Sequence, residues 1–593
     1  MESATAVAPT GGRIEGDADE AQDGASSASA GSARRGGRLR ALLGRPVVAA
    51  ALLLLVYLAL ASFMSPEGFL GTDTAGKVAT VKVMSERGDF DPDVGYWAAE
   101  WDPEARVHGL YYTSRVGDRF VQVTSLPLVL VARPLWDVGG YRATLLLPML
   151  GGLGAALAAR ALARRLGDGD GWTAYWVIGL ASPVTIYSLD LWEHSLGLAL
   201  MAWAAVALHD AVERRPHWWR GLVAGAMLGA AAAMRTEAFV YALAMTAVAC
   251  LVLCFGRRRS IGAALRVGAA TVVGFALMFG ANLALETAVL GEPFRSSRAG
   301  GAATAGGSMA ALRVQEALTT LLAPAGWTGA APWLLGGLLA LALGYGAVKA
   351  TEAGEERRVR LAAAMVAVAY LAVVVSGLGF VPGMVAATPF VAVGVALGWR
   401  TTATRLLLAL AIVPLPLVFA FQYVGGAGPQ WAGRYLLPSG LLAAVVGIVE
   451  SRRMLAWART GLIVLSVGVT AFGLAWLSVR SHGVAGAGTA LAERQEDVLI
   501  APDGFVAREF GATYGQRDWL AAGTPDDVRF AVDVAAASGA ETFALVVVEP
   551  TTPPPDFDGW IVGPSDPLAF LTGTDFVVTT YCRSTATETT ACR

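Results

Sequence analysis

Blocks of about 17 to 25 consecutive apolar residues recur along most of this 593-residue chain, and a block of this length spans a bilayer as a helix. Only 16% of the residues are charged, against about 25% in ordinary soluble proteins. So few charges cannot cover the surfaces of several soluble domains. The sequence therefore predicts an α-helical polytopic membrane protein, and its net charge of −2 without a basic domain excludes a nucleic-acid partner.

The first apolar block, at residues 46–64, follows a basic run that ends at Arg45. Residues 1–45 contain few large apolar side chains, so we expect a disordered cytoplasmic tail. No small-residue cleavage site follows the block, which predicts an uncleaved first helix with its N-terminus in the cytoplasm.

Twelve further apolar blocks bring the expected number of transmembrane helices to about 13. They lie near residues 142–159, 172–188, 194–209, 221–236, 238–255, 262–285, 329–348, 361–379, 382–398, 405–422, 435–449 and 460–479. About nineteen basic residues fall in the loops that this order places inside, and about five in the later loops that it places outside. The asymmetry follows the positive-inside rule and predicts a multi-pass protein whose transmembrane domain covers residues 46–480.

An odd number of spans places residues 481–593 outside the membrane. Their composition is that of a soluble domain, with strand-like runs at 497–501, 542–549 and 576–581 and a helical stretch at 525–538. The pattern predicts a small extracytoplasmic α/β domain. Cys582 and Cys592 lie in this domain, on the oxidising side of the membrane, where a disulfide is expected.

The first external loop, residues 65–141, is too long for a simple connection, and long loops are usually functional. Its stretch Thr72–Met84 has the pattern of a helix on the membrane surface, with Lys77 and Lys82 facing lipid headgroups. The stretch Val121–Trp136 contains two prolines and an arginine, so we expect a second interfacial helix there and not a span.

An acidic residue opens this loop soon after the first helix, and a series of short motifs follows. The series is Leu180-Ala-Ser-Pro183, Asp190-Leu-Trp-Glu193-His194-Ser195, Met234-Arg-Thr-Glu-Ala238, Asn282 with Leu290-Gly-Glu-Pro-Phe294, and Trp431-Ala-Gly-Arg434-Tyr435-Leu-Leu-Pro438. In order and topology it resembles the GT-C class of integral membrane glycosyltransferases. The resemblance implies inverting transfer of a sugar from a polyprenyl-phosphate donor to a glycan, lipid or protein acceptor of the cell envelope, at the outer face of the plasma membrane. No cofactor is required by these residues, and a carboxylate-bound divalent cation such as Mg²⁺ is compatible with them.

Sugar transfer of this kind needs a base for the acceptor hydroxyl and cations for the departing phosphate. In the GT-C class the base is an acidic residue at the start of the first external loop, and Asp73 is the residue that matches. Many members have two adjacent acids, whereas this chain has Thr72-Asp73. Asp73 can also act as the N-cap of the helix that follows, and the two roles are compatible.

Arg235 and Arg434 are almost the only basic residues in short external turns, and a guanidinium matches phosphate oxygens. We expect both to bind the donor phosphate, together with Lys77 and His194. The alternatives are a local pair between Arg235 and Glu237, and an Arg434 side chain that extends to the headgroups.

The acceptor or the sugar is expected to contact Asp190 and Glu193 in the second external turn, and the aromatic rings of Trp97, Trp101 and Tyr435. The alternatives are interfacial anchoring for the turn and loop-core packing for the tryptophans. The competing function is a polytopic transporter or a lipid-linked glycan flippase. It predicts internal repeats and an ionisable site near the bilayer midplane, whereas the ionisable residues of this sequence gather at the external face.

Overall fold

The computed structural model describes residues 46–123, 125–256, 260–293, 317, 320–321, 362–367, 369, 382–421, 431–548, 554–571 and 574–584. The chain divides into two compact units, Met1–Leu53 and Leu54–Arg593. The predicted tail at 1–45, the predicted span at 329–348 and most of the predicted span at 361–379 lie outside the described residues. Helix α2 (Pro46–Ala61) forms the expected first apolar helix and carries the boundary between the units.

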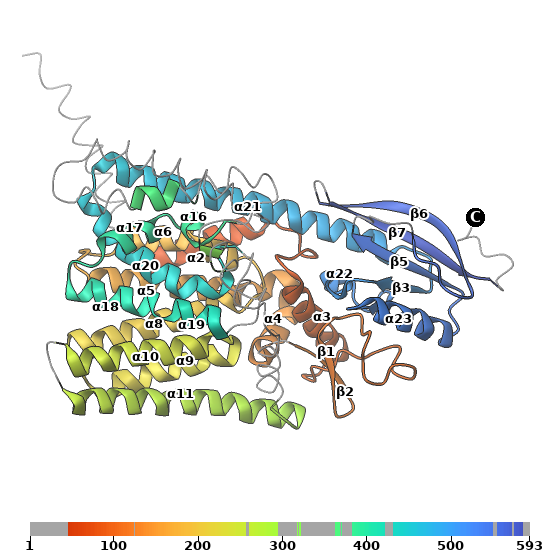
Figure 1. The fold of residues 1–593 in the computed structure, drawn as a ribbon, viewed down its shortest axis with the longest axis horizontal. Coiled ribbons are helices and arrows are strands. Elements are labelled where there is room, and N and C mark those ends of the chain that lie inside the picture. Colours follow the sequence, from red (N-terminus) through yellow and green to blue (C-terminus); the bar gives the residue numbers. More distant parts are fainter. Residues whose placement is uncertain are drawn as a thin grey trace, which may run out of the picture. The chain divides into compact units, whose positions relative to one another are not determined.

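The second unit is mostly helical. Its first apolar helices are α5 (Leu146–Arg165), α8 (His194–Glu213), α9 (Trp218–Met234), α10 (Glu237–Phe255) and α11 (Ile261–Leu290). Helix α9 packs against both α8 and α11, as neighbouring rows in Figure 1 show. Among the described residues, seven helical stretches are long and apolar enough to cross a membrane. The predicted total of about 13 stays a prediction.

Two of the predicted spans are interrupted at prolines. The stretch 172–188 divides into α6 (Trp172–Leu180) and α7 (Pro183–Tyr187), and the stretch 382–398 into α16 (Met384–Ala387) and α17 (Phe390–Leu397). Proline has no backbone N–H and disfavours helical geometry at the residue before it. The predicted continuous helices were wrong for this reason.

The last helices of the unit are α18 (Thr402–Ile412), α19 (Pro414–Phe421), α20 (Leu437–Glu450) and α21 (Ala456–Ala492), with 3-10 turns η3 (Arg434–Leu436) and η4 (Ser451–Arg453). Helix α21 has 37 residues and extends well past the predicted span at 460–479. At 1.5 Å per residue it exceeds the ~30 Å hydrocarbon core of a bilayer. The first strand of the C-terminal sheet begins at Val498, within the predicted strand-like run at 497–501.

The first loop folds into α3 (Thr72–Arg87), a hairpin of β1 (Thr113–Val116) and β2 (Arg119–Gln122), and α4 (Leu126–Thr144). The predicted helix at 72–84 is present. The second predicted helix begins at Leu126 and not at Val121, because Val121 pairs with Ser114 in the hairpin.

The C-terminal region is a five-stranded sheet of order β4-β3-β5-β7-β6. Its strands are β3 (Val498–Ala501), β4 (Asp518–Ala521), β5 (Thr542–Val548), β6 (Trp560–Leu571) and β7 (Thr574–Arg583). Its helices are α22 (Gly504–Glu509) and α23 (Pro525–Ala537), with the turn η5 (Gly511–Thr513). The three predicted strands and the predicted helix are present, and β4 and β6 are additional. Strand β3 is parallel to β4 and β5, whereas β7 is antiparallel to β5 and β6.

Candidate active site

Asp73 lies in the first turn of α3, where the helix dipole favours a negative charge. The N-cap of this helix is Gly71, and no side chain bonds to the cap. The capping interpretation of Asp73 was therefore wrong. Its side chain is 32% exposed, which makes it the most accessible charged group in the cluster that surrounds it.

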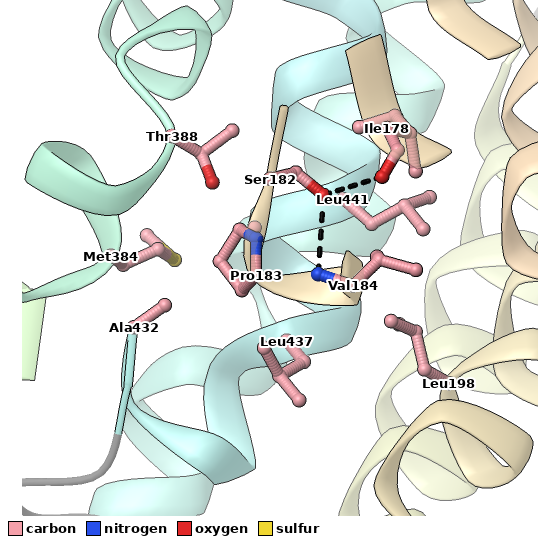
Figure 2. Close-up of a pocket in the computed structure, with 11 residues that line it drawn as sticks. Ile178, Ser182, Pro183, Val184, Leu198, Met384, Thr388, Ala432, Leu437 and Leu441 are labelled. Atoms are coloured by element: carbon pink, nitrogen blue, oxygen red, sulfur yellow. Dashed lines mark hydrogen bonds between the residues drawn. The ribbon is translucent and has the colours of Figure 1, made fainter. Parts of the chain in front are cut away.

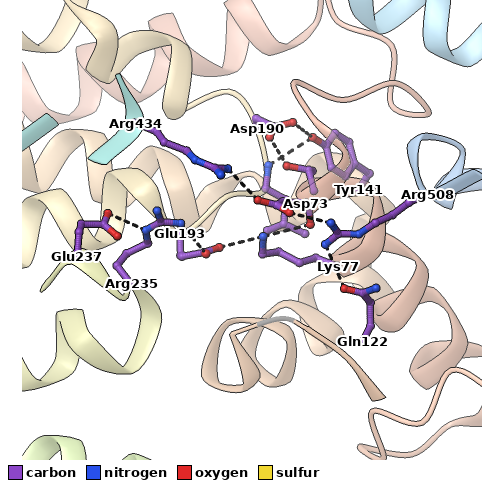
Figure 3. Close-up of polar contacts among 12 residues, drawn as sticks. Asp73, Lys77, Gln122, Tyr141, Asp190, Glu193, Arg235, Glu237, Arg434 and Arg508 are labelled. Carbon is purple, nitrogen blue, oxygen red and sulfur yellow. Dashed lines mark hydrogen bonds and ion pairs between the residues drawn. The ribbon is translucent and has the colours of Figure 1, made fainter. Parts of the chain in front are cut away.

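Two arginines from distant parts of the chain hold the two carboxylate oxygens of Asp73 (Figure 3). Arg434 Nη1 donates to Oδ2 at 3.0 Å, and Arg508 Nη1 donates to Oδ1 at 2.9 Å. Both arginine side chains are buried, with 9% and 0% exposed. The guanidinium groups of Arg434 and Arg508 thus form a buried cationic wall behind the Asp73 carboxylate.

Arg434 begins the turn η3, directly before α20. Its guanidinium lies 5.4 Å from the ring centroid of Trp192 and 5.0 Å from that of Tyr435. Because the side chain is buried against these rings and Asp73, it does not extend to the headgroups as the alternative interpretation held. Tyr435 is itself buried, so the structure places its ring against arginines and not on an open surface.

Arg508 was not among the residues singled out from the sequence. It lies in the short helix α22, and 435 residues separate it from Asp73. No local pattern signals such a pair, because the neighbours Val506 and Ala507 only indicate a buried helix.

Lys77 follows Asp73 by one helical turn and is 3% exposed. Its Nζ donates to the backbone oxygen of Asp73 at 3.1 Å and pairs with Glu193 Oε2 at 3.1 Å. The expectation that Lys77 faces lipid headgroups was wrong, since its charge is neutralised by Glu193 inside the protein. Lys82 is also turned inward and donates to the backbone oxygens of Ala512 and Tyr514.

Arg235 joins the same buried network through two carboxylates (Figure 3). Its Nη1 lies 3.2 Å from Glu193 Oε1, and its Nε donates to Glu237 Oε1 at 2.9 Å. The local pair with Glu237 is thus present, and Glu193 bridges Arg235 to Lys77. A donor phosphate would have to compete with these carboxylates for either cation.

Asp190 supports the start of α3. Its Oδ1 accepts from the Leu70 backbone N–H and the Tyr141 hydroxyl, each at 3.1 Å, and its Oδ2 accepts from the Thr74 hydroxyl. Burial raises the pKa of Asp190, and these hydrogen bonds oppose the rise only in part. Only 1% of Asp190 is exposed, and its hydrogen bonds hold the start of α3; its role in acceptor binding stays a prediction.

His194 begins α8 and lies among aromatic rings, 4.4 Å from the Trp192 centroid and 5.0 Å from that of Tyr187. Trp97 and Trp101 pack against the apolar cluster of the C-terminal sheet, and Trp97 Nε1 donates to the Trp519 backbone oxygen at 3.2 Å. The tryptophans therefore occupy the packing position that was the alternative to sugar stacking.

The surrounding charges control the protonation of Asp73. Burial raises its pKa, but the positive charges of Arg508, Arg434 and Lys77 lower it by more. The pKa therefore lies well below its usual range, and the carboxylate is ionised at neutral pH. An acid in this state is a weak base until one of the cations is drawn away.

No group of three or more histidine, cysteine, aspartate and glutamate side chains forms a metal set in the described part of the chain. A divalent cation at Asp73 would have to displace a guanidinium from the carboxylate. Cys582 is disulfide-bonded, and Cys592 lies outside the described residues, so the pairing of these two stays a prediction. Cys250 and Cys254 are free thiols in α10.

An apolar pocket lies between α7 and α20 (Figure 2). Its lining residues are Ile178, Ser182, Pro183, Val184, Leu198, Met384, Thr388, Ala432, Leu437, Gly440 and Leu441. The Ser182 hydroxyl is already bonded to Ile178 O and Val184 N, which leaves a mainly apolar wall. Ala432, which lines this pocket, precedes Arg434 by two residues in the chain.

No protein-family model and no curated protein matches the chain. Among solved structures, it is similar to ArnT from Cupriavidus metallidurans bound to undecaprenyl phosphate, with 13% identity, a TM-score of 0.38, and 89% of this chain and 97% of that chain covered. The apo state of the same protein gives 14% identity, a TM-score of 0.36 and the same coverage. The Archaeoglobus fulgidus oligosaccharyltransferase in complex with zinc and sulfate has 11% identity and a TM-score of 0.40, with 83% of this chain and 67% of that chain covered. These neighbours are of the kind that the sequence resemblance names. At such TM-scores they do not establish the function, which is inferred from the side chains of the site.

Proposed function

We propose that this protein is a membrane glycosyltransferase that moves a sugar from a polyprenyl-phosphate donor to an acceptor hydroxyl, with Asp73 as the general base. The observation that carries the proposal is the partly exposed carboxylate of Asp73 between the buried guanidinium groups of Arg434 and Arg508. A base and a phosphate-binding cation are the two groups that such a reaction needs within reach of one substrate.

In the proposed reaction, Asp73 Oδ2 accepts the proton of the acceptor hydroxyl as its oxygen bonds to the anomeric carbon. The bond from that carbon to the phosphate oxygen breaks on the opposite side, which inverts the anomeric configuration. The electron pair stays with the polyprenyl phosphate, whose negative charge Arg434 neutralises. When Arg434 turns to the phosphate, Oδ2 loses a cationic neighbour and becomes a stronger base.

Arg434 is the favoured donor residue because it pairs with the partly exposed Asp73, whereas Lys77 and Arg235 pair with the buried acids Glu193 and Glu237. The cationic wall supplies charge that a metal would otherwise provide, so cofactor-free transfer is part of the proposal.

We also infer that the site faces outward, with the N-terminus in the cytoplasm and residues 481–593 extracytoplasmic. The support is the placement of charge along α8, which begins beside Glu193 and ends near the basic loop of Arg214 and Arg215. Basic loops stay on the cytoplasmic side. An outward site suits acceptors of the cell envelope. The proposal includes a location in the plasma membrane and about 13 transmembrane helices.

The test is release of polyprenyl phosphate by the purified protein from a panel of polyprenyl-phosphate hexoses and pentoses, with envelope extract as acceptor. We expect one donor to be consumed and its sugar to appear on the acceptor. A second arm measures movement of the same lipids across proteoliposomes. Lipid movement without transfer would contradict the proposal and favour the flippase.

A further inference from the structure

We propose that Arg508 of the C-terminal sheet region is the positioning residue for Asp73, holding one carboxylate oxygen so that the other faces the substrate. The proposal rests on the proposed function and names a role for the sheet region in it. It is carried by the geometry of Arg508, its partners and the helix that bears it.

The Arg508 guanidinium is fixed on two sides. While Nη1 donates to Asp73 Oδ1, Nη2 donates to Gln122 Oε1 at 3.1 Å. The amide of Gln122 is held in turn, because its Nε2 donates to the Tyr111 backbone oxygen at 2.7 Å. Arg508 thus cannot follow a substrate away from Asp73 without breaking a second buried contact.

Helix α3 is shaped to receive this guanidinium. Gly76 lies one turn after Asp73, and a Cβ at this position would come within 3.0 Å of Arg508 Nε and 3.2 Å of the Gln122 amide carbon. A glycine inside a helix is unfavourable relative to alanine. The close approach of Arg508 accounts for the presence of a glycine at position 76.

Helix α22 carries Arg508 rigidly. Val506 and Ala507 pack in the apolar cluster of the sheet with Leu499 and Trp519. The next residue, Glu509, pairs with Arg480 of α21. Sheet and helix therefore fix the backbone from which Arg508 reaches Asp73.

The two arginines on Asp73 differ in their surroundings. Arg508 has no exposed side-chain surface and donates to two side chains, whereas Arg434 is 9% exposed, lies against the rings of Trp192 and Tyr435, and pairs with the carboxylate oxygen that we assign to chemistry. We expect Arg434 to turn to the donor phosphate and Arg508 to stay. The electrostatic effect of Arg508 on Asp73 gives a readout that a purely structural role would not move.

The test is carbodiimide labelling of Asp73 in the full-length detergent-purified protein, followed by mass spectrometry across a pH series. A carbodiimide modifies only the protonated carboxyl. The wild type should resist labelling at Asp73 down to about pH 4, near the ordinary value of this acid. Arg508→Gln should move the labelling midpoint upward by about 1–3 pH units, the usual effect of an opposite charge at this distance.

Arg508→Met keeps the aliphatic stem and serves the same purpose if the glutamine variant does not insert. The matched control is Arg494→Gln, which removes a half-buried arginine paired with Glu496 and Asp566 in the same sheet region. We expect wild-type labelling for this control. A midpoint that is unchanged in both Arg508 variants, or shifted equally in the control, would overturn the proposal.

Kinetics separate this proposal from the proposed function. Arg508→Gln should lower kcat, because the Asp73 carboxylate loses the contact that orients it and this outweighs its higher pKa. The donor KM should stay near the wild-type value, because Arg434 still meets the phosphate. If the wild type transfers no sugar yet Arg508→Gln shifts the labelling, the positioning role stands and the proposed function fails. Transfer by the wild type with unshifted labelling gives the opposite result.

Discussion

Ion pairs lie near both ends of α8, and the two groups differ in which partner is exposed. Near its C-terminal end, Asp210 is 12% exposed and pairs with Arg165, which is 18% exposed, and with Arg214, which is 58% exposed. Asp168 and Glu450, with 0% and 2% exposed, also pair with half-exposed arginines of η4. Near its N-terminal end, Asp73 is the more exposed partner, with 32% of its side chain exposed, and its arginines are buried.

The difference indicates two uses of the same side chains. A buried acid with exposed arginines leaves basic groups at the surface, as the positive-inside rule predicts for a cytoplasmic side. A partly exposed acid with buried arginines offers its carboxylate to whatever enters. The inverted arrangement at Asp73 is therefore the part of the molecule suited to chemistry.

The largest effect is expected for Asp73→Asn. The amide cannot accept the proton of the acceptor, so kcat should fall by about 10²-fold or more. The rate of polyprenyl phosphate release measures it. Asp210→Asn is the matched variant for the other cluster and should lose stability but keep its turnover per folded molecule. Equal losses of kcat in the two variants would remove the distinction.

Arg434→Ala should act mainly on the donor. A hydrogen bond to a charged group contributes about 1.5–3 kcal/mol, so the donor KM should rise by roughly 10-fold or more. Arg214→Ala removes an arginine from the Asp210 cluster and serves as the control. An unchanged donor KM in Arg434→Ala would make Arg434 a structural partner of Asp73 only.

The sequence predicted the parts of the fold and of the site that depend on local pattern. The helix at Thr72 and the helix at Pro525 follow from periodicity, and the strands from short apolar runs. Asp73 was singled out because it opens the first external loop, as the base does in the class that the sequence resembles, and Arg434 because few basic residues lie in short external turns.

Other parts depend on which segments meet in space. The contact between Arg508 and Asp73 joins the sheet region to the first loop. The burial of Lys77 depends on Glu193, which lies far along the chain. Helical periodicity placed Lys77 on a polar face but could not show that this face meets a carboxylate.

The pH dependence should separate the free enzyme from the donor complex. The arginines lower the pKa of Asp73 in the free enzyme, so the acid limb of kcat/KM, which reports this state, should lie at low pH. In the donor complex Arg434 turns to the phosphate, which raises the pKa, and the acid limb of kcat should lie at higher pH. Superimposable limbs would argue against the movement of Arg434.

The smallest effect is expected for Trp97→Phe. Its ring packs against the sheet cluster, away from the paired charges, so the variant should lose only some stability. Thermal unfolding and the KM values for donor and acceptor measure the two effects. A raised KM for either substrate with normal stability would restore Trp97 to the substrate site.

We expect Arg434 to bind the donor phosphate and Asp73 to act as the general base. Binding of sugar-free polyprenyl phosphate to wild type, Asp73→Asn and Arg434→Ala tests this expectation most directly. Asp73→Asn should bind the lipid at least as tightly as the wild type, because the carboxylate no longer competes for Arg434, and Arg434→Ala should bind it roughly 10-fold more weakly. Weakened binding in Asp73→Asn to the level of Arg434→Ala, with the protein folded, would contradict the account.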